Sequence, residues 1–170
     1  LTTGNTLSMV MGLRHCEGET LILDGDVLYP PQALTSYVEN AQRSSFALIS
    51  ADIEDAECAK VLLTPSGTIH AFITKRALTK DERLGFGFGG EAIGFFMLSK
   101  EDVPRFVKLY EKREEDFRPV LWEIPFTEFA VNTTLHPWQV TEEGCFEIDT
   151  QEDYSAALSQ FQSHPDLYKL

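Results

Sequence analysis

Leu21-Ile22-Leu23-Asp24-Gly25-Asp26 is the most informative segment of this 170-residue chain. Its short apolar run is typical of a buried strand, and the two aspartates around a glycine mark the loop that follows. In open α/β sheets, ligands bind beyond the carboxyl ends of the strands, where these carboxylates lie. Carboxylate oxygens suit Mg²⁺, and the glycine lets a ligand approach the backbone closely. The stretch therefore predicts a ligand site with a divalent cation, the alternative being a solvated Asp-Gly turn.

Helix-period and strand-period segments alternate along the rest of the chain. In the first fifty residues, the pattern predicts helix 5–14, strand 20–23, helix 32–43 and strand 45–50, the βαβ rhythm of a parallel sheet. The remaining predicted elements are a hairpin over 59–74, a mobile glycine-rich loop over 77–90, a strand over 91–98, helices over 101–113 and 119–130, short strands over 138–141 and 145–148, and a final helix over 151–161. This alternation predicts a single α/β domain over 1–170.

Composition and net charge limit the binding partners and the compartment that fit this chain. The net charge of −13 argues against binding duplex nucleic acid or an anionic membrane, and it is compatible with a divalent-metal site. No apolar run approaches the roughly 20 residues that cross a bilayer. The three cysteines lie far apart and form no CxxC pair, which favours a reduced, cytoplasmic compartment. A homo-oligomer is compatible with these features.

A second motif, Phe146-Glu147-Ile148-Asp149-Thr150, carries two more carboxylates. Glu147 and Asp149 are two residues apart, so on a strand they point to the same face. Asp149 also stands where that strand meets a helix capped by Thr150. Taken alone, Asp149 is equally explained as a helix-start residue.

Together the two motifs resemble the sugar-phosphate, phosphocholine and 2-aminoethylphosphonate nucleotidyltransferases. That family ends its central strand with a similar Gly-Asp and closes its catalytic region with Glu-Ile-Asp followed by Asp-Tyr. The resemblance implies an α/β fold with a Rossmann-like mixed sheet flanked by helices, of the nucleotide-diphospho-sugar transferase type. It implies that Asp26 and Asp149 jointly hold Mg²⁺ on the nucleotide α-phosphate.

The implied reaction transfers a nucleoside monophosphate, with CTP favoured as donor. A phosphate or phosphonate oxygen of a small acceptor attacks the α-phosphorus, and pyrophosphate leaves. The nucleotide-binding residues implied by the resemblance are Thr3, Gly4, Asn5, Ser8, Asp24 and Gly25. The first four are equally explained as an ordinary helix start.

The resemblance also implies acceptor-binding positions. Lys60 and Lys75, on the predicted hairpin, are candidate anion-binding residues, with Lys75 placed at the catalytic centre; the alternative is exposed surface lysines. Glu91 and Glu147 would contact the acceptor, and Gly94 would leave room for it. Trp122 and Glu123 would bind an amine or choline head group through cation–π and charge contacts, although an aromatic residue on a helix is more often core.

The sequence departs from the family at one large feature. The glycine-rich signature that binds the triphosphate is absent, and the glycines over 85–90 lack the preceding strand and following helix that such a loop needs. We therefore expect an N-terminal βα portion to be missing, so that this chain represents a C-terminal fragment of a larger domain.

Two other functions fit the same residues. Leu21 to Asp26 also resembles the DxD motif of haloacid-dehalogenase phosphatases, with Asp24 as nucleophile and Asp26 as acid. Position 28 is Leu, however, where that family needs Thr or Val. The second alternative is a truncated domain that binds a small molecule or a protein without catalysis.

Overall fold

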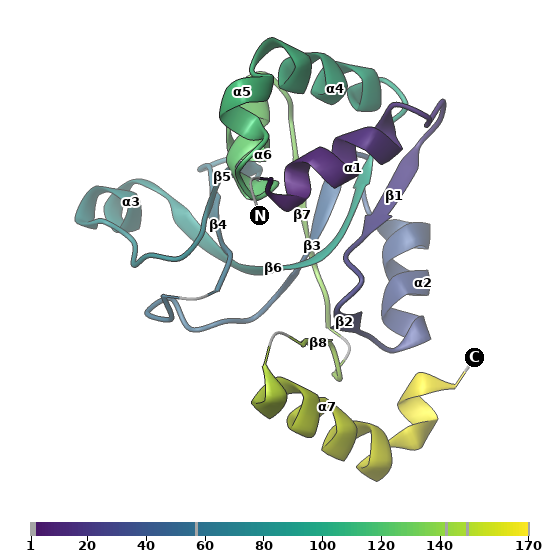
Figure 1. Ribbon diagram of the computed structural model, residues 1–170. Helices are drawn as coiled ribbons and strands as arrows, with labels where there is room; N and C mark the ends of the chain where they lie inside the picture. Colours follow the sequence, from purple (N-terminus) through teal and green to yellow (C-terminus); the bar gives the residue numbers. More distant parts are fainter. Residues whose placement is uncertain (1–2, 57, 142, 149, 170) are drawn as a thin grey trace.

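The computed structural model describes residues 3–56, 58–141, 143–148 and 150–169. A six-stranded mixed sheet forms the centre, in the order β5-β4-β6-β3-β7, and β1 pairs with β6 beside this path (Figure 1). The strands of this sheet are β1 (Thr20–Leu23), β3 (Ser45–Ile49), β4 (Lys60–Leu63), β5 (Ile69–Ile73), β6 (Gly87–Leu98) and β7 (His136–Gln139). A separate two-stranded ribbon joins β2 (Val27–Leu28) to β8 (Phe146–Glu147).

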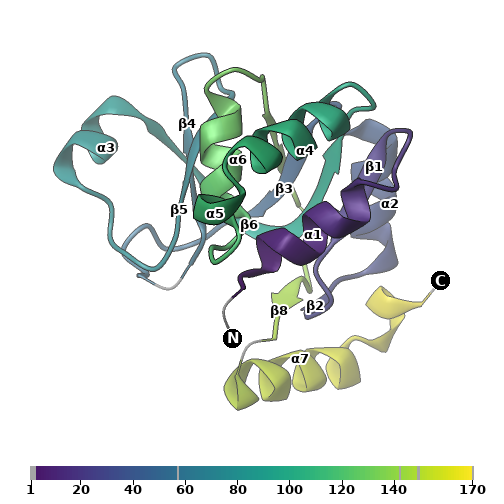
Figure 2. The same cartoon turned by 45° about the horizontal axis from the view of Figure 1, so that its top comes forward.

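Helices cover both faces of the sheet. The helices are α1 (Asn5–Leu13), α2 (Pro31–Asn40), α3 (Lys80–Gly85), α4 (Asp102–Lys112), α5 (Glu114–Phe117), α6 (Glu123–Ala130) and α7 (Gln151–Ser163), followed by a 3₁₀ turn (Pro165–Tyr168). α1, α4 and α6 lie together on one side, and α2 lies on the other (Figure 2). This arrangement confirms the predicted α/β fold with a mixed sheet flanked by helices.

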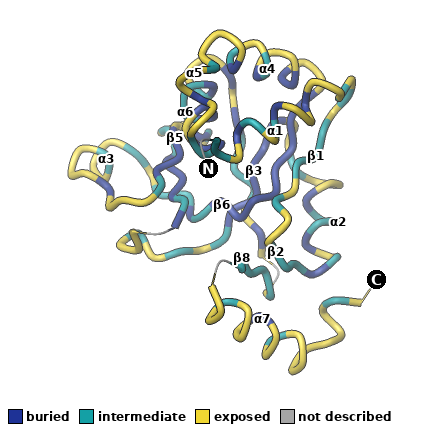
Figure 3. The backbone as a smooth tube through the Cα atoms, viewed as in Figure 1, coloured by how far each residue is buried: buried dark blue, intermediate teal, exposed yellow. Residues whose placement is uncertain are grey.

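The two faces of β6 build two cores. Phe96 and Leu98 pack with residues of α1, α4 and α6, whereas Phe95 and Met97 pack with Ala33 and Tyr37 of α2. Successive side chains of a strand point to opposite faces, so one apolar strand serves both sides. Figure 3 shows β3 and β6 as largely buried, while α7 is mostly exposed at the periphery.

The predicted parallel pairing of the first two strands was wrong. β1 and β3 run in the same direction, but β6 lies between them and is antiparallel to both. The parallel partner of β3 is β7. The 12-residue β6 is apolar enough along its second half to be buried between two strands, which the local βαβ rhythm cannot reveal.

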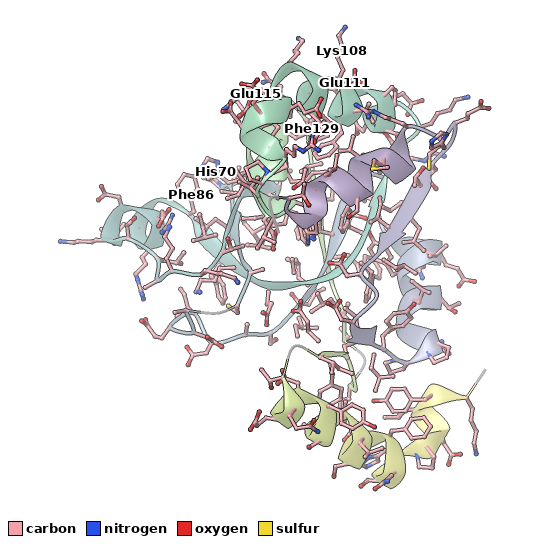
Figure 4. All side chains as sticks on the ribbon, viewed as in Figure 1. His70, Phe86, Lys108, Glu111, Glu115 and Phe129 are labelled. Carbon is pink, nitrogen blue, oxygen red and sulfur yellow. The ribbon has the colours of Figure 1, made fainter. Side chains whose placement is uncertain are left out.

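The predicted mobile loop over 77–90 was also wrong. Thr79 and Glu82 form a capping box that starts α3, and Glu82 also pairs with Arg76. Phe86 then stacks on His70 of β5, with ring centroids 3.8 Å apart, and both are labelled in Figure 4. The glycines that follow belong to β6, because their backbone groups pair with β4.

The ordered edge strand β5 is covered by α6. The Thr127 hydroxyl accepts a hydrogen bond from the Phe72 N–H at 2.9 Å, and it lies 3.3 Å from the Phe72 carbonyl oxygen. Ile69 donates its N–H to the carbonyl of Leu135 at 2.8 Å. These contacts satisfy polar groups that an edge strand otherwise exposes, and they hold the middle of α6 beside β5.

Replacing Gly90 tests whether the backbone of β6 passes as close to β3 as the structure shows. It has a φ of +115°, and an added Cβ would lie 2.2 Å from the Ile49 carbonyl oxygen. We expect Gly90→Ala to lower the free energy of unfolding by about 2–4 kcal/mol, measured by urea denaturation. Gly12→Ala is the control, since a Cβ there meets nothing within 4 Å and α1 gains about 0.5–1 kcal/mol of helix propensity. If Gly90→Ala and Gly12→Ala had the same free energy of unfolding, the close approach of β6 to β3 at Gly90 would be contradicted.

Candidate active site

The candidate site lies where β6 changes its pairing partner. Glu91 is paired with Lys60 of β4, whereas Phe95 is paired with Leu23 of β1. The backbone continues each ladder by one bond: Ala92 N–H to Ala59 O at 3.0 Å, and Asp24 N–H to Gly94 O at 2.7 Å. The two neighbouring strands therefore diverge at 92–94, and a gap opens in that edge of β6.

A cavity of about 350 Å³ occupies this junction, a size that suits a small-molecule ligand. Its lining comes from β6 and β8, from the segments that directly follow β1 and β5 and precede β4 and α6, and from the first residues of α1 and α6. The lining residues are Asn5, Asp24, Gly25, Asp26, Ala59, Thr74, Lys75, Glu91, Ala92, Gly94, Leu121, Trp122, Glu123 and Glu147. Five of them are acidic, while Lys75 is the one basic residue within this described lining.

Asp24 is held at the end of β1 by two contacts. Its carboxylate accepts a hydrogen bond from the Trp122 indole N–H at 3.2 Å. Gly94, with a φ of +72°, leaves room for it, because an added Cβ would lie 2.8 Å from Asp24 Oδ2. The space at Gly94 was predicted to accommodate a substrate, and the structure fills it with the Asp24 side chain instead.

Burial raises the pKa of Asp24 above its usual range. The hydrogen bond from Trp122 opposes this shift, and the negative charge of Asp26 adds to it. Asp26 itself is exposed at the cavity, and Gly25 between the two has open space around its Cα. Two carboxylates that repel each other at a strand end suit a hard divalent cation, which would favour both ionised forms.

Trp122 is a core residue with one polar edge toward the site. It is 4% exposed and packs against Phe46, Phe72 and Phe96, with centroid separations of 4.9–5.9 Å. The predicted cation–π contact with a ligand does not fit this packing, because phenylalanine rings surround the indole. What Trp122 provides to the cavity is the N–H that orients Asp24.

Glu123 is the most unusual group of the site. It is 7% exposed, and its Oε2 has no hydrogen-bond partner among the described residues. Burial raises its pKa, its own backbone N–H lowers it, the charge of Asp24 raises it further, and Lys75 lowers it. A buried acceptor without a donor costs folding free energy, so its position at the cavity calls for a functional explanation.

Lys75 stands directly after β5 in a strained conformation. Its φ is +51°, in the left-handed region that residues with a side chain seldom adopt. The residue is exposed and lines the cavity next to Thr74. Backbone strain of this kind recurs at functional sites, and here it presents the one ammonium group of the lining.

Lys60 is not part of the cavity lining, where an anion-binding residue was predicted, and it is not the exposed surface lysine of the alternative either. It is completely buried, and its Nζ donates to the carbonyl oxygens of Cys58 and Arg76, each at 3.4 Å. Its neighbour Glu91 does line the cavity. Burial raises the pKa of Glu91, the Ala59 N–H lowers it, the charge of Asp55 raises it, and Lys60 lowers it.

The β2–β8 ribbon brings the second motif to the first. Glu147 is paired with Val27, and the Ile148 N–H donates to the Asp26 carbonyl at 2.9 Å. Glu147 thereby reaches the cavity, as predicted for an acceptor-binding position. Asp149 lies outside the described residues, so its predicted role as metal ligand stays a prediction. The apolar pair Val27-Leu28 after the Asp-Gly-Asp turn was the sequence signal for this ribbon, and it was missed.

The start of α1 contributes one lining residue. Asn5 Oδ1 accepts from the Trp122 backbone N–H at 2.9 Å and so links α1 to α6. Gly4 donates to the Arg118 carbonyl, and a Cβ there would lie 2.0 Å from the Val120 oxygen. The Ser8 hydroxyl donates to the Asn5 carbonyl at 2.8 Å. Of the four residues predicted here to bind nucleotide, Asn5 lines the cavity, and Thr3, Gly4 and Ser8 are not part of the lining.

The donor set fits a hard cation, although it is incomplete within the described ranges. Those ranges omit position 149, and in them no three His, Cys, Asp or Glu side chains are grouped as metal ligands. Asp24 and Asp26 supply carboxylate oxygens at one end of the cavity, and Asn5 an amide oxygen. Oxygen donors of this kind suit Mg²⁺ and do not favour softer metals.

Comparisons with known proteins show which proteins share the fold of this chain. No protein-family model matches the sequence, and no curated protein sequence matches it. Among solved structures, the chain resembles the inositol-1-phosphate CTP transferase of T. maritima, with 18% identity, a TM-score of 0.68, and coverage of 95% of this chain and 63% of that one. The fold is that of a nucleotidyltransferase.

Two further solved structures share this fold. The CTP:phosphocholine cytidylyltransferase of Streptococcus pneumoniae has 12% identity and a TM-score of 0.66, over 95% of this chain and 64% of that one. A UDP-glucose pyrophosphorylase complexed with UDP-glucose has 13% identity and a TM-score of 0.69, and the match covers 96% of this chain and 63% of that one. The chain thus spans a little under two-thirds of the length of each. No described helix is both long and apolar enough to cross a membrane.

The buried carboxyl group of Glu123 predicts a pH-dependent stability. Because folding raises its pKa, the native state binds its proton more tightly, and stability is lost as pH rises from the unfolded pKa through the folded one. We expect Glu123→Gln to raise the free energy of unfolding at neutral pH by about 1 kcal/mol or more. The gain should shrink as the pH falls toward about 5, measured by urea denaturation across that range.

Glu128→Gln is the matched control on the same helix. The Glu128 side chain is 38% exposed and pairs with Arg113, so its replacement should change stability by less than about 1 kcal/mol, without this pH trend. A Glu123→Gln variant that is less stable than the wild type at neutral pH would show that the carboxylate is satisfied in the folded protein.

Proposed function

We propose that this chain forms the acceptor-binding and metal-binding part of a nucleotidyltransferase that moves CMP from CTP onto a phosphorylated or phosphonylated small molecule. One observation carries the proposal. The Ile148 N–H bond to the Asp26 carbonyl joins the two acidic motifs at a single cavity, on a fold shared with nucleotidyltransferases. The motifs are more than a hundred residues apart in sequence, and each alone is explained by an ordinary turn or helix start.

The reaction is an in-line displacement at phosphorus. An oxygen of the acceptor phosphate or phosphonate forms a bond to the α-phosphorus, the bond from that phosphorus to the bridging oxygen breaks, and pyrophosphate leaves with the electron pair. Asp26 and Asp149 would hold Mg²⁺, which neutralises charge on the phosphate oxygens. The protein's own task is to position the two substrates and to exclude water.

The described residues divide that task between two ends of the cavity. Asn5 and the Asp24-Gly25 turn line the end at β1, where the nucleotide would lie. Lys75 would attract the negatively charged phosphoryl groups, since it is the one basic group of the described lining. Glu91, Glu123 and Glu147 would contact the acceptor. The triphosphate would need further cationic and backbone donors from the third of the fold that the chain does not span.

The fold supports this proposal over a haloacid-dehalogenase phosphatase. The solved structures that the chain resembles transfer nucleotides by their printed names. Asp24, the nucleophile of that alternative, is partly buried and accepts a hydrogen bond from Trp122. An aspartyl nucleophile would need this group open to the phosphorus atom.

Asp26→Ala tests the metal assignment. In the full-length protein that contains this chain, we expect turnover to fall by on the order of 100-fold or more, because loss of one ligand removes a few kcal/mol of transition-state stabilisation. The assay follows pyrophosphate release from CTP with a panel of phosphorylated and phosphonylated acceptors. The product is identified by mass spectrometry, and a chelator should abolish activity that added Mg²⁺ restores.

Asp166→Ala is the control for that variant. Asp166 is an exposed aspartate paired with Lys169 at the end of the chain, and it lies outside the cavity lining. Its replacement should leave turnover within about twofold, since exposed ion pairs of this kind contribute little. Wild-type kinetics from Asp26→Ala would refute the metal site, and phosphate release from the acceptor alone would favour the phosphatase.

A further inference from the structure

A groove between α4 and the end of α6 has the opposite charge balance to the candidate active site. Its volume is about 290 Å³, and its lining comes from α4, from the end of α6 and from the turn that follows α6. The charged residues of this lining are Arg105, Lys108, Lys112 and Glu128. Three basic groups therefore face one carboxylate, in a chain whose net charge is −13. A concave surface lined by one sign of charge concentrates ions of the other sign, so this groove attracts anions.

Lys108 and Lys112 are the free cations of the groove. They stand four residues apart on α4, so their ammonium groups lie on the same face of the helix and repel each other. Neither forms an ion pair within the described ranges, and the carboxylate of the groove, on Glu128, is engaged by Arg113. Figure 4 labels Lys108 on α4 and Phe129 on α6, the two helices that border the groove. An anion bound beside the two lysines would offset their repulsion.

Arg105 adds a third cation, which the fold holds in a fixed position. Its Nη1 donates to Asp102 Oδ1 at 2.6 Å, and its Nη2 donates to the Asn132 carbonyl at 2.9 Å. The guanidinium also lies over the Phe129 ring, 5.7 Å from its centroid. A guanidinium has five N–H donors, so donors remain for a ligand. Because the fork is already anchored, binding costs less side-chain entropy than it would for a free arginine.

Thr133 supplies the polar group that calls for a ligand. It lines the groove, its side chain belongs to a residue that is 8% exposed, and its Oγ1 has no hydrogen-bond partner in the part of the chain that the structure describes. A buried hydroxyl without a partner costs folding free energy, and native proteins rarely leave one unsatisfied. Solvated lysines on a helix would need no ligand, whereas this hydroxyl does. A ligand oxygen in the groove would accept its hydrogen bond.

We propose that this groove binds a compact phosphate-bearing small molecule at a site separate from the candidate active site. A phosphoryl group carries about 1.5–2 negative charges at neutral pH and three acceptor oxygens. These match two free ammonium groups, the remaining guanidinium donors and one hydroxyl, whereas a single carboxylate has less charge and fewer acceptors. A volume near 290 Å³ is at the lower end of the range for small-molecule sites, so it suits phosphate, pyrophosphate or a short phosphate ester.

The helix α6 connects the groove to the candidate active site. Its first residue, Glu123, lines the active-site cavity, while Glu128 and Phe129 near its end line the groove. The two sites therefore lie at the two ends of one helix. The phosphate site goes beyond the proposed nucleotidyl transfer and does not depend on it, because its test measures binding without CTP or acceptor.

A pair of lysine variants tests the site by isothermal calorimetry with inorganic phosphate and with pyrophosphate. The full-length protein that contains this chain is used at constant ionic strength, since salt screens charge. We expect Lys108→Ala/Lys112→Ala to raise the Kd by on the order of 10-fold or more, because charge-assisted hydrogen bonds are lost. Lys80→Ala/Lys100→Ala is the control, with the same change in net charge at two exposed lysines outside both linings. Its Kd should stay within about twofold of the wild type.

Three outcomes would overturn the proposal. One is that neither phosphate nor pyrophosphate binds to the wild type. Another is an equal effect of the two double variants, which would indicate general attraction by charge, or no effect of either, which would place the bound anion elsewhere, the candidate active site included. The third is that a short peptide of glutamates binds at the two groove lysines while phosphate does not, which would assign the groove to an acidic protein partner.

Thr133→Val separates binding from folding, because it removes the hydroxyl and keeps a side chain of similar size. We expect the Kd for phosphate to rise by on the order of 3- to 10-fold. The free energy of unfolding without phosphate, measured by urea denaturation, should stay the same or rise, since the hydroxyl has no partner in the free protein. Thr35→Val, at an exposed position of α2, should leave the Kd unchanged. A less stable Thr133→Val with an unchanged Kd would show that the hydroxyl serves the fold and would overturn its assignment to the ligand.

Discussion

The site depends on the change of partner along β6. This strand pairs with β4 through Glu91 and with β1 from Phe95 onward, and it keeps β3 along its other edge. The gap between β4 and β1 lies between the last bond on the β4 side, from the Ala92 N–H to the Ala59 carbonyl, and the first on the β1 side, from the Asp24 N–H to the Gly94 carbonyl. Gly94 takes a positive φ at that point and leaves room for Asp24. A continuous ladder with an L side chain at 94 would fill the space in which the carboxylates now lie.

The second constraint is the grouping of acidic side chains around that gap. Burial raises the pKa of Asp24, Glu91 and Glu123, because it disfavours the ionised form of each carboxyl group in the folded protein. Such an arrangement lowers stability, and proteins retain it where a ligand needs it. A divalent cation at Asp26 would offset part of the repulsion. Binding and folding would then be coupled through the same charges.

Several residues that the family resemblance assigned to the site hold neighbouring side chains and backbone segments in position. Trp122 orients Asp24 through its indole N–H, and its ring belongs to the aromatic core. Gly4 packs α1 against the segment before α6, while Asn5 fixes the backbone of Trp122. Lys60 lies beneath the cavity, bound to two carbonyl oxygens. These residues hold the lining groups in position, and Asn5 and Trp122 also line the cavity themselves.

The elements with local sequence signals could be predicted without the structure. The apolar run before Asp24, the hairpin around Gly67 and the Thr150 cap of α7 each follow from periodicity and capping, and all three are present. The mixed α/β class followed from their alternation. The local pattern misread the glycines after α3 as a loop, because glycine in a strand and glycine in a loop look the same until a partner strand is known.

The way in which those elements assemble into a site could be seen in the folded chain alone. The insertion of β6 between β1 and β3, the ribbon that joins Asp26 to β8, and the burial of Lys60 and Trp122 all depend on contacts between residues far apart in the chain. So does the burial of Glu123 Oε2 without a hydrogen-bond partner among the described residues. Pairing and burial are properties of neighbours in space, and a single sequence records neighbours along the chain only.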